Sequence, residues 1–125
     1  MHYFLAFLFL IFTDTTFAQV NQTKHSIKVN HVSFIMYHRF GDSRYPSTNI
    51  TKDQFQNHIK ELVKPKYNVI SIEQAMRAIN EEELVKDKSV VITIDDAYSS
   101  VFNYAWPLLK KNNLPFTLFV STDVI

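Results

Sequence analysis

A run of β-branched residues that ends in two adjacent carboxylates constrains the fold of this chain more than any other feature. Residues 90–94 (VVITI) show no clean polar–apolar alternation, and Asp95 and Asp96 follow directly. Such a run is typical of a strand buried on both faces in a parallel sheet covered by helices. In sheets and barrels of that class, functional groups collect at the carboxyl ends of the strands. Two carboxylates placed there repel each other unless a cation or a shared proton lies between them, so the pair predicts a chemical site.

A structural interpretation of the pair stays open, in which one Asp caps the next helix and the other faces solvent. Neighbouring residues on a strand point to opposite faces. Asp95 and Asp96 can therefore reach a common point only where the strand has ended and the backbone turns. Residues 97–99 (AYS) favour such a turn, with Ser99 as a candidate N-cap of the following helix.

Strand and helix patterns alternate along the rest of the chain. Strands are predicted at residues 31–38, 67–70, 89–94 and 115–121, helices at residues 52–63, 72–79 and 99–111, and a polar loop at residues 39–49. The first two helices follow capping-box patterns, which begin at Thr51 and Ser71. Pro107 is expected to kink or restart the third helix. This order predicts an α/β fold with a mostly parallel sheet.

The length of 125 residues and a hydrophobic share of 46% suit one domain with a real core. Four strands are too few to close a barrel, and the last strand has no helix after it to cover one face. We therefore expect residues 31–125 to be the N-terminal portion of a larger domain.

The N-terminus has the pattern of a signal peptide over residues 1–18, followed by a polar linker over residues 19–30. Its apolar run, residues 3–12, is too short to span a bilayer but fits a signal-peptide core. Thr16 and Ala18 supply small residues at the two positions that a signal peptidase recognises, so cleavage is expected after Ala18. The alternative is that this segment forms a buried N-terminal strand or helix. With no cysteines, an exported protein of this kind suits a bacterial periplasm, cell envelope or extracellular space. A formal net charge of +1 without a basic block indicates neither nucleic acid nor an anionic membrane as partner.

His38 is the second candidate for the site. It follows the first predicted strand, so a parallel sheet brings it to the same edge as Asp95 and Asp96. A lone His is more often structural than catalytic. Catalytic zinc usually takes three protein ligands, and the chain has no His-x-x-x-His spacing. A complete metal site therefore cannot be assembled from these residues.

Several segments together resemble the polysaccharide deacetylases, the NodB-homology domain of carbohydrate esterase family four. The similarity lies in VITIDDAY (residues 91–98), NYAWPLLKK (residues 103–111) and PFTLFV (residues 115–120). Upstream, it lies in MYHRF (residues 36–40) and in the segment at 51–75. The upstream segments resemble exported deacetylases that act on poly-N-acetylglucosamine. The resemblance covers residues 31–125 and implies the N-terminal portion of an irregular (β/α) barrel.

The resemblance also implies an activity, which is hydrolysis of the carbon–nitrogen bond of N-acetyl groups on an N-acetylglucosamine polymer or chitooligosaccharide. Asp95 would be the general base, Asp96 a ligand of a divalent metal such as zinc, and His38 the general acid. The family commonly has Gly or a similar small residue where Ala97 stands, and Ala favours negative φ. The family's two metal-binding histidines lie downstream of the last strand, beyond residue 125. We therefore expect this chain alone to be inactive.

Two other interpretations remain. A glycosidase or phosphatase with paired carboxylates would need a further acid, for which Asp123 is the obvious candidate. A carbohydrate-binding or assembly module without a metal site could use aromatic side chains to stack on sugars, with Tyr98, Tyr104 and Trp106 as candidates; as interior residues of an α/β fold, they are more simply core.

Overall fold

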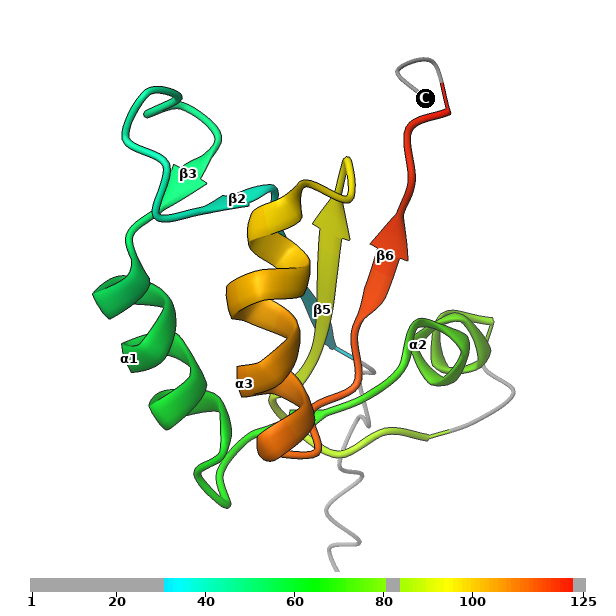
Figure 1. Cartoon of the computed structure of the whole chain (residues 1–125). Helices are drawn as coiled ribbons and strands as arrows, with labels where there is room; N and C mark the ends of the chain where they lie inside the picture. The colour runs from blue at the N-terminus through cyan, green and yellow to red at the C-terminus, as the bar shows by residue number, and fades with distance from the viewer. Residues whose placement is uncertain (1–30, 81–83, 123–125) are drawn as a thin grey trace, which may run out of the picture.

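The computed structural model describes residues 31–80 and 84–122 as helices and strands joined by short loops (Figure 1). The expected signal peptide, the linker and Asp123 lie outside the described residues. The strands are β1 (Val32–Tyr37), β2 (Arg39–Phe40), β3 (Asn49–Ile50), β4 (Asn68–Val69), β5 (Ser89–Asp95) and β6 (Thr117–Phe119). The helices are α1 (Lys52–Leu62), α2 (Ile72–Ile79), the π-helical turn η1 (Val101–Ala105) and α3 (Trp106–Lys111).

β5 is the central strand of a four-stranded sheet in which every pairing is parallel. β1 pairs with it from Val32 opposite Ser89 to Tyr37 opposite Ile94. β1 therefore occupies one edge of β5 over six rungs. β4 and β6 divide the other edge, with β4 beside the first residues of β5 and β6 beside the last. The predicted α/β architecture with a parallel sheet is confirmed.

The interpretation of residues 39–49 as a plain loop was wrong in one respect. β2 and β3 form a separate parallel ladder, in which Arg39 lies opposite Asn49 and Phe40 opposite Ile50. The ladder is only two rungs long, so no periodicity in the sequence announces it. It draws the ends of the intervening loop together beside the start of α1.

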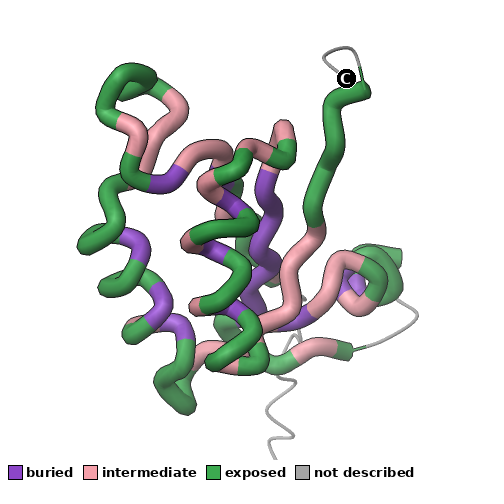
Figure 2. Tube along the Cα trace, in the orientation of Figure 1, coloured by how far each residue is buried: buried purple, intermediate pink, exposed green. Residues whose placement is uncertain are grey.

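Both faces of β5 are buried, as its sequence predicts; Figure 2 shows the strand as a nearly continuous buried segment. Val90, Ile92 and Ile94 belong to the main core, on the side of α1 and α3. Val91 belongs to a smaller cluster with residues of α2. Helices thus cover both faces of the strand, and this explains why neither face carries charged residues before Asp95.

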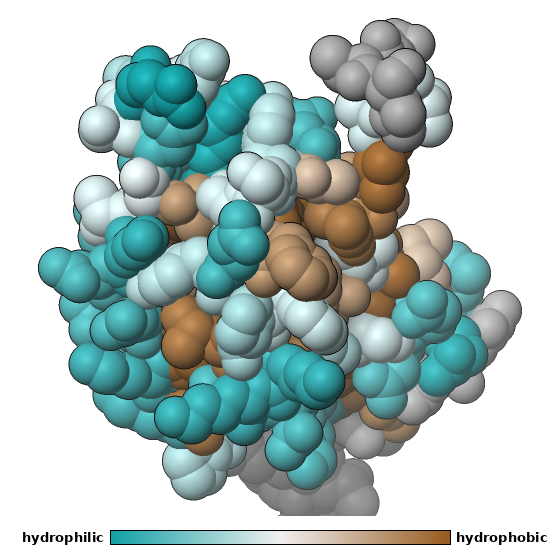
Figure 3. All heavy atoms as spheres, viewed as in Figure 1, coloured by the Kyte–Doolittle hydropathy of each residue, from teal (hydrophilic) through white to brown (hydrophobic). Residues whose placement is uncertain are grey.

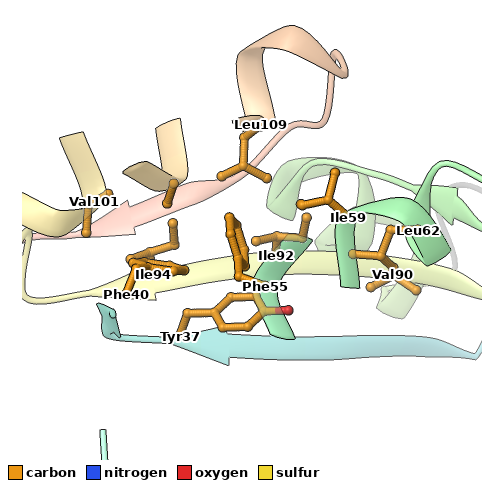
Figure 4. Close-up of a cluster of buried hydrophobic side chains, with 11 residues drawn as sticks. Tyr37, Phe40, Phe55, Ile59, Leu62, Val90, Ile92, Ile94, Val101 and Leu109 are labelled. Carbon is orange, nitrogen blue, oxygen red and sulfur yellow. The ribbon is translucent and has the colours of Figure 1, made fainter. Parts of the chain in front are cut away.

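Phe55 is the centre of the main core, with no exposed surface (Figure 4). Its ring meets that of Phe40 edge-on at a centroid distance of 4.6 Å, and that of Tyr37 at 5.3 Å. Tyr37 also reaches the surface of α1, where its hydroxyl lies 2.9 Å from Nδ1 of His58. Burial raises the pKa of Tyr37 to about 12. His58 therefore serves as the polar partner of a mostly buried phenol.

The two capping boxes form as predicted. Thr51 and Ser71 each accept a hydrogen bond from the third residue of their helix, and the Gln at that position bonds back to the cap. In α2, the spacing of the apolar residues Ile72, Ala75, Met76 and Ile79 predicts a stripe that faces the core, but Met76 and Ile79 are about half exposed. Ala75 and Ala78 are buried instead, and their small side chains let α2 approach the sheet closely.

The interruption expected at Pro107 takes the form of η1. Proline has no N–H and its ring clashes with the preceding turn, so a regular α-helix cannot run through it. The backbone N–H of Trp106 donates to the carbonyl of Val101, five residues back, and α3 begins at Trp106. Ser99 is not the cap of this run. Ser100 precedes it, and its hydroxyl accepts a hydrogen bond from the N–H of Phe40 instead.

We expect Phe55→Ala to lower the free energy of unfolding by about 3–5 kcal/mol, because it removes a fully buried ring from the centre of the core. Phe102→Ala is the matched control, since that ring is 67% exposed, and it should cost less than about 1 kcal/mol. Urea denaturation of the two variants measures both values. Equal losses would contradict this assignment of the core.

Candidate active site

The pairing of β1 with β5 brings His38 to Asp95. The last rung joins Tyr37 to Ile94, so the next residues, His38 and Asp95, lie beside each other at the carboxyl edge of the sheet. Nε2 of His38 is 3.7 Å from Oδ2 of Asp95, and the side chains are 25% and 28% exposed. This distance is longer than a hydrogen bond but suits an ion pair when the imidazole is protonated. A group at this edge can thus meet both a carboxylate and an imidazole.

The backbone turns sharply at Asp96 and Ala97, whose φ angles are 69° and 48°. The backbone of both residues therefore lies in the left-handed region, which costs a residue with a Cβ about 1–2 kcal/mol. The N–H of Asp96 donates to the carbonyl of Phe119 at 2.9 Å, which ties the turn to the end of β6. This turn lets consecutive carboxylates serve one site, although a continuing strand would send them to opposite faces.

Asp95 and Asp96 open on the same hollow, which has a volume of about 400 Å³. The ends of β1, β5 and β6 supply its walls; besides the two carboxylates it is lined by Met36, Thr93, Phe119, Val120 and Ser121. Figure 1 shows that the chain leaves β5 and β6 at the same edge of the sheet, the edge toward which the β2–β3 loop also projects. Two acids beside apolar walls form a mixed lining that can hold both the polar and the apolar part of a ligand.

The described part of the chain does not complete a metal centre. Within residues 31–80 and 84–122, no group of three or more His, Asp or Glu side chains is placed to hold an ion. Catalytic zinc takes three protein ligands. Asp95, Asp96 and His38 share one edge of the sheet but do not converge on a single point as a ligand set.

Arg39 is a site neighbour that the sequence pattern did not single out. Its guanidinium carbon lies 3.5 Å from the centre of the Tyr98 ring and 4.0 Å from that of Tyr45. Burial and the Asp96 carboxylate raise the pKa of Tyr98, whereas the positive charge of Arg39 lowers it. The one feature of the sequence that could have indicated Arg39 as a site residue is its position directly after His38.

A second hollow, of about 240 Å³, lies between η1, α3 and β6 and is mainly apolar. Phe102 and Trp106 stack beside it with ring centroids 5.4 Å apart, and Figure 3 shows apolar side chains gathered over this part of the surface. Tyr98 and Trp106 line it, but Tyr104 packs near Phe55 and donates to the Lys52 carbonyl. The three aromatic residues considered for sugar stacking therefore do not form one platform.

The family model of the polysaccharide deacetylases matches residues 82–125. YxkH of Bacillus subtilis, whose name assigns it to the polysaccharide deacetylases, is 29% identical over 86 residues, which are 69% of this chain and 30% of that protein.

Three solved structures are also similar. A de-N-acetylase from Aggregatibacter actinomycetemcomitans is 26% identical with a TM-score of 0.60, and the match covers 70% of this chain and 36% of that one. The Streptococcus pyogenes deacetylase PplD, in complex with acetate, is 26% identical with a TM-score of 0.62 over 71% and 42%. IcaB from Ammonifex degensii is 28% identical with a TM-score of 0.61 over 74% and 39%. The chain spans less than half the length of each relative named here.

We expect Ala97→Gly to raise the free energy of unfolding by about 0.5–1 kcal/mol, because Gly adopts a positive φ without the steric cost that Ala pays. Ala75→Gly in α2 is the matched control and should lower stability by at least about 1 kcal/mol, because Gly inside a helix costs about that much and the methyl group of Ala75 is also fully buried. Thermal and urea denaturation measure both. If the two substitutions changed stability in the same direction, the left-handed turn at Ala97 would be wrong.

Proposed function

The chain carries part of a polysaccharide deacetylase domain, and on that premise we propose that the protein removes N-acetyl groups from an N-acetylglucosamine polymer or chitooligosaccharide by hydrolysis. The fold agrees with this membership, since the parallel sheet and its helices match part of the (β/α) barrel of the deacetylases. The observation that supports the proposal is the position of His38 beside Asp95, whose carboxylate lines the same hollow as that of Asp96.

Asp95 is the proposed general base. Its carboxylate is partly exposed and opens on the hollow, so an attacking water can reach it. In this scheme, Asp95 takes a proton from the water while the water oxygen adds to the carbonyl carbon of the acetamide. The approach of the oxygen and the removal of its proton occur together, so no free hydroxide has to form.

His38 is the proposed general acid. When the tetrahedral adduct collapses, the carbon–nitrogen bond breaks, and protonated His38 gives its proton to the leaving nitrogen; acetate and a free amine result. The 3.7 Å separation of Nε2 and Oδ2 leaves positions about 3 Å from both atoms, where a reacting group can lie. At this separation the base can act on the water that attacks the carbonyl carbon, while the acid protonates the nitrogen on the other side of the same carbon–nitrogen bond.

Asp96 is the proposed ligand of a divalent metal ion, zinc or similar, the cofactor that the deacetylase family implies. Its support is the chemistry of a carboxylate that opens on the same hollow as the base. The described residues do not supply a full ligand set, so the steps above rest on Asp95 and His38 alone.

Acetate release from N-acetylglucosamine oligomers by the complete product of the gene tests this function. We expect Asp95→Asn to lower kcat by about 10²–10⁴ and His38→Gln to lower it less. Asp53→Asn is the matched control, because that carboxylate is exposed in the first turn of α1 and does not line the hollow, and kcat should stay within about twofold. Full activity in Asp95→Asn would overturn the role of the base. Oligomer binding without acetate release would favour the carbohydrate-binding module instead.

Export to the periplasm, cell envelope or outside of the cell is part of the same proposal, because a polymer substrate cannot easily enter the cytoplasm. Its support is the signal-like pattern of residues 1–18. Among the described residues, no helix has the length and apolar character needed to cross a bilayer. N-terminal sequencing of the mature protein should find Gln19 first. A mature protein that keeps residues 2–18 would contradict a cleaved signal.

A further inference from the structure

The guanidinium of Arg39 is held between two tyrosine rings, Tyr45 on the β2–β3 loop and Tyr98 just after the acidic turn. Its carbon lies 4.0 Å and 3.5 Å from the two ring centres. At these distances a planar cation is attracted to the electron-rich face of each ring. Arg39 thus joins two segments that are about fifty residues apart in the sequence.

The Tyr45 side of this contact is anchored by the loop itself. The N–H of Arg39 donates to the carbonyl of Thr48 at 3.0 Å, and its Nη1 donates to the Thr48 hydroxyl at 3.3 Å. Asp42 and Tyr45 close the loop from within, because the N–H of Tyr45 donates to the Asp42 carbonyl at 3.2 Å and the N–H of Thr48 to the Tyr45 carbonyl at 3.1 Å. The arginine is therefore preorganised before it meets Tyr98.

On its other side, Arg39 contacts Tyr98, which belongs to the turn that carries the carboxylates of the proposed site. Tyr98 follows Asp96 and Ala97, both left-handed, so this turn persists only where its surroundings hold it. The neighbouring contact from the Phe40 N–H to the Ser100 hydroxyl, at 3.2 Å, ties β2 to the same segment. Among the ion pairs of the described residues, none joins Arg39 to either carboxylate, so its action passes through Tyr98.

We propose that Arg39 is a positioning residue, which clamps Tyr98 and thereby holds the turn at Asp96 and Ala97, with its two carboxylates, over the hollow. The part that concerns catalysis rests on the proposed function. The clamp needs the flat guanidinium as well as the charge, because only a planar group can stack between two rings. Arg39→Lys therefore keeps the charge but loses the clamp.

The clamp is tested by amide hydrogen exchange on the whole 125-residue chain. We expect exchange at the Asp96 amide, whose N–H is bonded to the Phe119 carbonyl, to rise about tenfold in Arg39→Ala and nearly as much in Arg39→Lys, because the turn opens more often once the stacking is lost. Exchange within β5 should stay unchanged, which shows that the sheet is intact. If Arg39→Ala fails to fold, Arg39→Lys carries the test. Lys110→Ala is the matched control: it removes a cation 5.0 Å from the ring centre of Trp106 and should leave the turn unaffected. Unchanged exchange at the Asp96 amide would overturn the clamp.

The positioning role is tested by kinetics of the complete gene product. We expect Arg39→Ala and Arg39→Lys to lower kcat about tenfold with KM within about twofold, because the carboxylates lose their placement while the rest of the hollow remains. Faster exchange with an unchanged kcat would make Arg39 a structural residue only and would overturn the positioning role. If the wild-type protein released no acetate, the proposed function would fail, and the exchange experiment would still decide on the clamp.

Discussion

The register between β1 and β5 is the constraint on which the rest of the site depends. Six parallel rungs, closed by Tyr37 opposite Ile94, determine which residue of each strand reaches the carboxyl edge. A slip of one residue would turn every side chain of β1 to the other face, since side chains alternate along a strand. His38 would then no longer lie beside Asp95, and Tyr37 would leave its place against Phe55. Burial of the aromatic core thus stabilises the same register that assembles the site.

The central strand and the helix starts could be predicted because each depends on local chemistry. Residues 90–94 carry no charge and are mostly β-branched, and the capping boxes at Thr51 and Ser71 are complete within four residues. The position of His38 beside Asp95 also follows from parallel strands, which present their ends at one edge of a sheet. What these residues do chemically was inferred from the family resemblance and not from the pattern itself.

The features that escaped prediction depend on contacts between distant segments. Nothing in residues 39–49 indicates the β2–β3 ladder, because two rungs are too short for any periodicity. The burial of Ala78 in place of Ile79 depends on how closely α2 approaches the sheet. The stacking of Arg39 joins a loop to a turn far along the chain. The conformation of Ala97 is opposite to its local backbone preference, because an alanine normally avoids the left-handed region that the turn requires.

The π-helical turn before Pro107 has a consequence for how the third helix faces the sheet. Val101, Ala105 and Leu109 are all buried at four-residue intervals. In an α-helix, four residues overshoot a full turn by about 40°, so two such steps would carry Leu109 roughly 80° around the axis from Val101. In the wider π turn, four residues fall short of a full turn. The angular deficit from Val101 to Ala105 therefore offsets the angular excess from Ala105 to Leu109. The single irregular turn therefore corrects the helical phase, so that one straight stripe of small and branched side chains meets β5 along the length of the helix.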